Sequence, residues 1–316
     1  MKFVLEAMAV RKVHFIEYFP IMFKTVHHLT HAAVLLAFVL PLQGNTMWAQ
    51  SELWIMRGTW NTFPDSVPAL RLESDSIWTG RNAAISRPAD IPSSITVHNT
   101  DSLDHLCALI ADASESTLIP AGSSAIIEMP ALPLGVHRLG LVDTIGDRLG
   151  AVSMVQAGLT ELTADEADLF YWNLGDWNTE SIWQIDAGDY TGEGESYMPN
   201  QFTINEQSYP ATTEDPNGAI EVQLGDTCWI AIANHGLMDH VLHFHGFHVL
   251  IETSTHHPER IGWSKDTVPI KRGEGMTLRL IANLPGTYPV HNHNLIAVTN
   301  AGFYPGGMIT HINVQP

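Results

Sequence analysis

The stretch "DHVLHFHGFHV", from Asp239 to Val249, places four histidines within nine residues. Only Phe244 separates His243 from His245. Residues two apart on a β-strand face the same side, so these two imidazoles project together, while Leu242 and Phe244 face the opposite side. The alternation predicts a strand with one apolar face and one face that carries histidines.

A second histidine pair has the same spacing. In "GTYPVHNHNLI", from Gly286 to Ile296, His291 and His293 flank Asn292. Two strands that each present such a pair can bring four imidazoles together, and imidazole is a ligand for copper, zinc, nickel and iron. The alternative is a solvated sheet face, which we favour less because the pair is repeated among apolar residues. We expect four other histidines to be solvated: His235, His256, His257 and His311.

The chain after Ser51 consists of short β-type runs separated by turn signals, without a long segment of helical period. This pattern predicts an all-β fold, most simply one or two Greek-key β-sandwich or barrel domains. We place a domain boundary near residue 160, which gives one domain over 51–160 and a second over 161–316. Ala164–Leu174 is predicted to form a strand, and "DAGDYTGEGES", Asp186–Ser196, a solvated loop.

The composition excludes some partners. The 316 residues include 15 basic and 34 acidic side chains, a formal net charge of -19. Such a charge argues against nucleic acid or an anionic membrane surface as partner. The only two cysteines, Cys107 and Cys228, are too few for a disulfide scaffold. We expect two buried thiols; a disulfide between them would have to join the two domains.

The first 50 residues are interpreted as a signal peptide region. Ala32–Leu42, "AAVLLAFVLPL", is an apolar run too short to span a bilayer, and a cleavage site is expected near Ala49. The stretch before this run is long for a signal peptide, so we expect the true start at Met22. The alternative is a single membrane anchor. Cleavage predicts a secreted or periplasmic protein without a membrane span in its mature chain.

The histidine stretches resemble those of the multicopper oxidases and the related copper nitrite reductases, which are built from cupredoxin domains. The run from His240 to His248 is similar to the oxidase motif His-Pro-x-His-x-His-Gly-His. Further similarities are "FTINEQSYP" (Phe202–Pro210), "GWSKDTV" (Gly262–Val268) and "PGTYPVHNHNLI" (Pro285–Ile296). The resemblance covers residues 165–316 and implies two cupredoxin domains and copper as cofactor.

The resemblance also implies roles for the paired histidines. By position, His243 matches a type 2 copper ligand, whereas His245, His291 and His293 match type 3 ligands. His240 and Met308 match two ligands of the type 1 copper, the blue centre that accepts electrons in oxidases. Further candidates for metal ligands are His105, His137, His240 and His248.

Asn292 is a departure from the family pattern. The oxidase motif carries a cysteine at this position, and its thiolate is the ligand that a blue-copper site requires. The second type 1 histidine is also missing, since the residues after His293 include none up to Asn300. We therefore expect no type 1 copper, and we expect His240 to have a structural role.

The first domain departs further from the oxidase pattern. In oxidases it donates two His-x-His pairs, but here the matching places read His105-Leu106-Cys107 and His137-Arg138-Leu139. At most one histidine of each pair remains, so we expect one or two copper ions in place of a full cluster. We favour a structural role for this domain.

Two functions remain open at this point. The chain is either a copper-dependent oxidoreductase that acts on dioxygen, nitrite or a small reductant, or a non-catalytic copper or zinc protein that sequesters or delivers metal. A structural module without metal is a third alternative. In the enzyme, Asp239 or Asp266 would orient a ligand imidazole or relay protons. Two-domain relatives are commonly trimers with copper between subunits, so the resemblance implies a homotrimer.

Overall fold

The computed structural model describes residues 51–110, 115–162, 169–190 and 196–316. The predicted signal peptide region lies outside the described residues. Residues 47–316 form one compact unit. None of the helices in the described ranges is long and apolar enough to cross a membrane.

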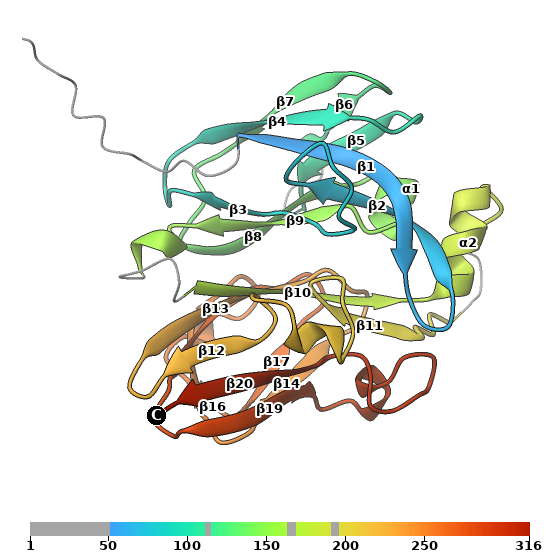
Figure 1. Ribbon diagram of the computed structural model, residues 1–316. Helices are drawn as coiled ribbons and strands as arrows, with labels where there is room; N and C mark the ends of the chain where they lie inside the picture. The colour runs from blue at the N-terminus through green and yellow to red at the C-terminus, as the bar shows by residue number, and fades with distance from the viewer. Residues whose placement is uncertain (1–50, 111–114, 163–168, 191–195) are drawn as a thin grey trace, which may run out of the picture. The chain divides into compact units, whose positions relative to one another are not determined.

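Four β-sheets make up the fold (Figure 1), which confirms the all-β prediction. The first two have the strand orders β2-β1-β4-β7 and β3-β9-β8-β5-β6. Their strands are β1 (Glu52–Asn61), β2 (Ser66–Glu73), β3 (Ala84–Arg87), β4 (Ser93–Asn99), β5 (His105–Leu109), β6 (Thr117–Ile119), β7 (Ser124–Met129), β8 (Gly135–Leu141) and β9 (Val152–Ala157).

The other two sheets contain the rest of the strands, in the orders β11-β10-β13-β18-β15-β16 and β12-β20-β19-β14-β17. These strands are β10 (Leu169–Trp177), β11 (Gln201–Ile204), β12 (Ile220–Gln223), β13 (Thr227–Asn234), β14 (His240–Phe244), β15 (Val249–Ser254), β16 (Ser264–Lys265), β17 (Thr267–Ile270), β18 (Gly275–Ile281), β19 (Gly286–Asn292) and β20 (Ile309–Gln315).

Each pair of sheets encloses its own hydrophobic core, so the chain contains two sandwiches. Side chains such as Leu53, Ile85 and Leu139 fill the first core, and Trp172, Phe244 and Ile312 fill the second. The chain passes from the first sandwich to the second between β9 and β10. That crossing lies around the boundary that we expect near residue 160.

A third, smaller cluster joins the two sandwiches. Val136 on β8 packs with Ala231 and Ala233 on β13. These strands lie close enough that a Cβ on Gly275 of β18 would come within 1.9 Å of the Val136 carbonyl oxygen. β13 is therefore almost continuously buried, and glycine at 275 permits the contact between sheets.

Two α-helices occur in the described residues, α1 (Thr144–Arg148) and α2 (Thr179–Ala187); 3-10 turns cover Leu159–Glu161, Ala211–Thr213, Pro258–Arg260 and Leu295–Val298. Asn178 caps α2 by accepting a hydrogen bond from the Ser181 backbone N–H, and Gly188 ends it in the left-handed conformation. Since α2 includes Asp186, the first residues of the predicted loop over Asp186–Ser196 are helical, and its residues 191–195 lie outside the described residues. Of the predicted strand over Ala164–Leu174, residues 169–174 belong to β10, and residues 164–168 lie outside the described residues.

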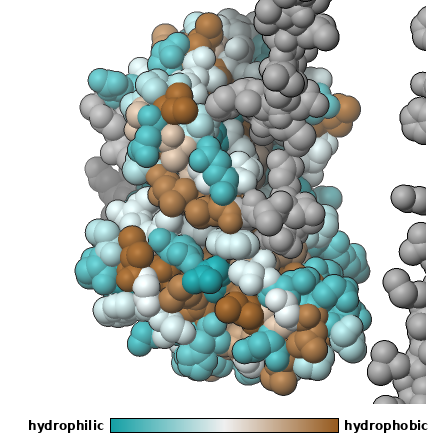
Figure 2. All heavy atoms as spheres, turned by 90° about the vertical axis from the view of Figure 1, so that its left-hand side faces the viewer, coloured by the Kyte–Doolittle hydropathy of each residue, from teal (hydrophilic) through white to brown (hydrophobic). Residues whose placement is uncertain are grey.

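The remaining sequence predictions for core and surface have mixed outcomes. Cys107 and Cys228 are both buried and free, as expected. His235 was expected to be solvated, and this is wrong, because its Nε2 lies 3.0 Å from Asn173 Oδ1 and its Nδ1 is buried. Burial lowers the pKa of His235 well below its usual value, with a further contribution from the positive charge of Arg138. On the face drawn in Figure 2, hydrophobic side chains are exposed in small groups between hydrophilic ones.

Candidate metal centre

The register between β14 and β19 brings the two histidine pairs together. The strands are antiparallel, and His243 lies directly opposite His291. Leu242 and Phe244 point into the core of the second sandwich and are almost fully buried. The imidazoles of both strands therefore lie on the outer face of the same sheet, as period-two alternation requires.

The four rings form one cluster, which we call the histidine cluster: His243, His245, His291 and His293. Ring centroids are 4.6 Å apart between His243 and His245, 5.6 Å between His243 and His291, and 5.9 Å between His243 and His293. His245 and His291 are closest at their nitrogens, with 3.0 Å between the two Nε2 atoms.

The hydrogen bonds of two rings decide which nitrogen faces the cluster. His243 Nδ1 is 3.0 Å from Thr267 Oγ1 on the neighbouring strand β17. His291 Nδ1 donates to the Asn292 carbonyl oxygen at 2.9 Å, because a carbonyl can only accept. With the proton of His291 on Nδ1, its Nε2 carries a lone pair directed at His245. Oriented imidazoles of this kind are typical of metal ligands.

One ring of the cluster, His245, has a lowered pKa. Burial lowers the pKa of His245, and the adjacent rings of His243 and His291 lower it further. His293 is exposed, so the cluster opens to solvent on one side. In the described part of the chain, no three His, Cys, Asp or Glu side chains already have the arrangement of a metal site.

Behind the cluster, a closed set of hydrogen bonds surrounds Asn292. Its Oδ1 accepts from the Asn294 backbone N–H at 2.9 Å, which identifies the other side-chain atom as the Nδ2 donor. That Nδ2 lies 2.9 Å from His240 Nδ1 and 3.3 Å from Met308 Sδ. The amide of Asn292 thus occupies the space between His240 and Met308.

His240 is held from its other side by a buried carboxylate. Its Nε2 lies 3.0 Å from Asp176 Oδ2, and both side chains are almost fully buried. Since Nδ1 accepts from Asn292, the proton is on Nε2 and is donated to Asp176. Burial alone would raise the pKa of Asp176, but hydrogen bonds, first of all the one from His240, outweigh it and lower the pKa. Both nitrogens of His240 are therefore satisfied within the protein.

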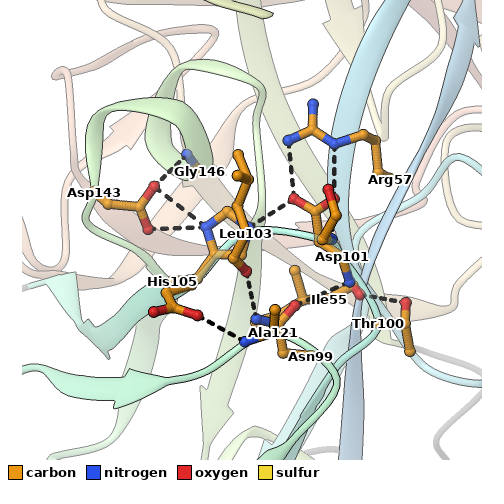
Figure 3. A network of polar contacts seen from close by, with 12 residues as sticks. Ile55, Arg57, Asn99, Thr100, Asp101, Leu103, His105, Ala121, Asp143 and Gly146 are labelled. Carbon is orange, nitrogen blue, oxygen red and sulfur yellow. Dashed lines mark hydrogen bonds and ion pairs between the residues drawn. The ribbon is translucent and has the colours of Figure 1, made fainter.

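His105, a candidate ligand in the first domain, lies between two carboxylates (Figure 3). Its Nε2 is 2.9 Å from Asp101 Oδ2, and its Nδ1 is 3.1 Å from Asp143 Oδ2. Arg57 forms two hydrogen bonds of 2.8 Å with the far side of Asp101 and a further ion pair with Asp186 at the end of α2. This row of alternating charges ties β1, β5, α1 and α2 together and leaves neither nitrogen of His105 free.

Burial and ion pairing shift the pKa values of His105 and Asp101 in opposite directions. Burial would lower the pKa of His105, but hydrogen bonds to Asp143 and Asp101 outweigh it and raise the pKa. Burial would raise the pKa of Asp101, but hydrogen bonds from Arg57 and His105 hold it at about 2. Both nitrogens of His105 bond carboxylate oxygens, so His105 has a structural role in this row and offers no free nitrogen to a metal.

The other candidate ligands lie away from the histidine cluster. His137 Nε2 bonds the Pro133 carbonyl oxygen at 2.8 Å, and His248 is exposed beyond the end of β14. Asp239 is engaged by Lys271 Nζ at 2.6 Å and by a backbone N–H, and Asp266 bonds Phe244 only through its backbone carbonyl. Neither carboxylate orients a ring of the cluster. The residue that does so, Thr267, was missed, because strand register is not visible in sequence.

The region that contains the histidine cluster matches a known protein family. The family model described as multicopper oxidase matches residues 183–306, a range that includes all four rings of the histidine cluster and Asn292. The predicted resemblance to the multicopper oxidases is confirmed. No curated protein matches the sequence.

Solved structures of copper oxidases share the fold of both sandwiches. The blue copper oxidase from Nitrosomonas europaea superposes with a TM-score of 0.66 at 20% identity, covering 83% of this chain and 85% of that one. The copper nitrite reductase from Nitrosomonas europaea superposes with a TM-score of 0.62 at 13% identity, covering 84% of this chain and 93% of that one. These likenesses agree with a fold of cupredoxin type over both sandwiches.

Proposed function

We propose that the chain is a copper-dependent oxidoreductase whose metal is held by the histidine cluster, without a type 1 blue copper. One observation carries the proposal: His243 stands opposite His291 on adjacent strands, with His245 and His293 on the same face. The matched family and the similar structures are copper proteins, which supports copper over the other metals that imidazole binds.

The residues fit such a metal. Imidazole nitrogens are ligands that copper accepts, and the ligands of one ion must lie close together. The Nε2 atoms of His245 and His291 are 3.0 Å apart. The protein already fixes the ring of His291 through its Nδ1, and Thr267 holds the ring of His243. His243 and His293, whose rings belong to the same cluster, would be the further ligands.

Bound copper would supply a redox centre and a Lewis acid. The chain itself would hold the ligand rings and leave the His293 side open to a small molecule. We infer that a small-molecule reductant delivers electrons directly at this open side and that dioxygen or nitrite is the acceptor. Asn292 supports direct delivery, because its amide fills the place where a type 1 copper would receive electrons.

The position of the Asn292 amide also favours the second function, a copper or zinc protein without turnover. The hydrogen bonds around Asn292 are complete without a metal, and no other electron entry is evident in the described residues. A site that cannot be reduced through the protein would serve to bind and hold metal.

Copper content and turnover together separate these functions. We expect the purified protein to bind copper and to consume oxygen, or reduce nitrite, with an artificial electron donor. His243→Ala combined with His293→Ala should abolish copper uptake, whereas His98→Ala with His257→Ala, two histidines outside the cluster, should not. Copper binding without turnover would establish the binding function, and full copper retention in the first variant would refute the site.

We further propose export through the predicted signal peptide and assembly into a homotrimer. The resemblance to two-domain relatives, which are commonly trimers with copper between subunits, supports assembly. Light scattering of the exported protein tests the trimer, and a monomeric mass with copper bound would contradict it.

A further inference from the structure

A cavity of about 380 Å³ lies between the two sandwiches, separate from the histidine cluster. β8 of the first sandwich forms one part of it, and the ends of β15 and β18 of the second form another. Its lining combines apolar and basic side chains: Leu109, Leu132, Val136, Arg138 and His256, with Gly273 beside them. The volume is within the range of small-molecule sites.

Arg138 provides an unpaired positive charge in this cavity. Across the described ranges of the chain, no carboxylate lies within ion-pair distance of its guanidinium, and Nη1 makes only a long contact of 3.3 Å to the Asn234 carbonyl oxygen. Burial lowers the pKa of Arg138 to about 10, so it stays protonated at neutral pH. A partly buried cation without a counter-charge is costly, and an anion would offset that cost.

His256 also lines this cavity and provides a ring nitrogen near Arg138. Its Nδ1 is 3.0 Å from Thr255 Oγ1, which leaves Nε2 without a partner within the described protein. A Cβ placed on Gly273 would lie 3.0 Å from Arg138 Nη2 and 3.8 Å from His256 Nε2. Both nitrogens therefore face one point, which is open because residue 273 has no side chain.

The charged groups around the cavity are mixed in sign. Asp147 places a negative charge and Arg272 a positive charge near Arg138, without an ion pair to it. Glu274, next to Gly273 in the chain, is buried and is engaged by Ser254 Oγ at 2.5 Å and by the Lys271 backbone N–H at 2.7 Å. In a protein with a formal net charge of -19, this is a local basic pocket with apolar walls.

We propose that this cavity binds a small carboxylate with an apolar body. The carboxylate would pair with Arg138 and accept a hydrogen bond from His256, and the apolar body would pack against Leu109, Leu132 and Val136. An arginine fork matches the two oxygens of a carboxylate better than it matches a single acceptor. Apolar walls select against inorganic anions, which carry no surface to bury.

Calorimetric titration with benzoate tests the site, with benzamide as the uncharged ligand of equal shape. We expect benzoate to bind at least tenfold more tightly than benzamide, and Arg138→Gln to weaken benzoate at least tenfold. Arg148→Gln removes an equal charge on α1 and should leave the affinity unchanged. Equal affinities for the two ligands, or unchanged benzoate binding in Arg138→Gln, would overturn the proposal.

Two further variants keep the test independent of folding and of copper. His256→Ala changes an exposed side chain, so the variant should fold, and it should weaken benzoate severalfold. Benzoate binding should persist in His243→Ala with His293→Ala, since the cavity is separate from the histidine cluster. Loss of binding in that variant, or full affinity in His256→Ala, would contradict the assignment.

Discussion

Replacing Asn292 with leucine tests whether its amide stabilises the fold in place of a metal. Leucine has nearly the same shape but makes none of the three side-chain hydrogen bonds of Asn292. His240 Nδ1 would become a buried acceptor without a donor, which costs roughly 1–3 kcal/mol. The Asn294 N–H lies closer to solvent and adds about 1 kcal/mol. We expect Asn292→Leu to lower the free energy of unfolding by about 2–4 kcal/mol.

Urea unfolding of the metal-free protein measures this loss. Asn283→Leu is the matched control: Asn283 is exposed and should change stability by less than about 0.5 kcal/mol. Copper content of Asn292→Leu should equal that of the natural sequence, because its side chain faces away from the histidine cluster. A loss below about 1 kcal/mol, or a parallel loss of copper, would refute the reasoning.

Three other predictions follow from the same contacts. His243→Ala alone should weaken copper binding at least tenfold in a chelator competition, and His293→Ala should weaken it less because that ring is exposed. His105→Phe should lose most stability, measured by urea unfolding, between about pH 4 and about pH 6.5. Above this range the ion pairs weaken as His105, whose pKa is raised, loses its proton, and below it they weaken as Asp101, whose pKa is lowered, gains one. A pH-independent difference would contradict the ion-pair row. Gly275→Ala should destabilise by about 3 kcal/mol in the same assay, because its Cβ would meet a backbone oxygen of β8 at 1.9 Å, and a neutral effect would refute that contact.

The sequence predicted the histidine pairs and their faces, because period-two alternation depends only on local geometry. "HVLHF" on β14 and "VHN" on β19 behave as expected, with Leu242 and Phe244 inside. The direct pairing of His243 with His291 depends on the register between strands 48 positions apart, which spacing within each motif does not reveal.

Contacts between distant segments explain what sequence analysis missed. His105 resembles a remnant of a ligand pair, but the residues that neutralise it, Asp101 and Asp143, meet it only after β5 and α1 are in place. Arg138 lies in His137-Arg138-Leu139, where the oxidases have a His-x-His pair, and nothing in the sequence marks it as part of a pocket. Its partner His256 lies on the other sandwich, so the pocket exists only once the two sandwiches pack.

Electron paramagnetic resonance of the copper-loaded protein tests the central claim most directly. The account predicts a copper signal with nitrogen couplings from several imidazoles, no thiolate-type blue-copper signal, and loss of the specific signal when His243, His245, His291 and His293 are all replaced by alanine. A blue-copper signal, or a copper signal that survives this fourfold replacement unchanged, would contradict it.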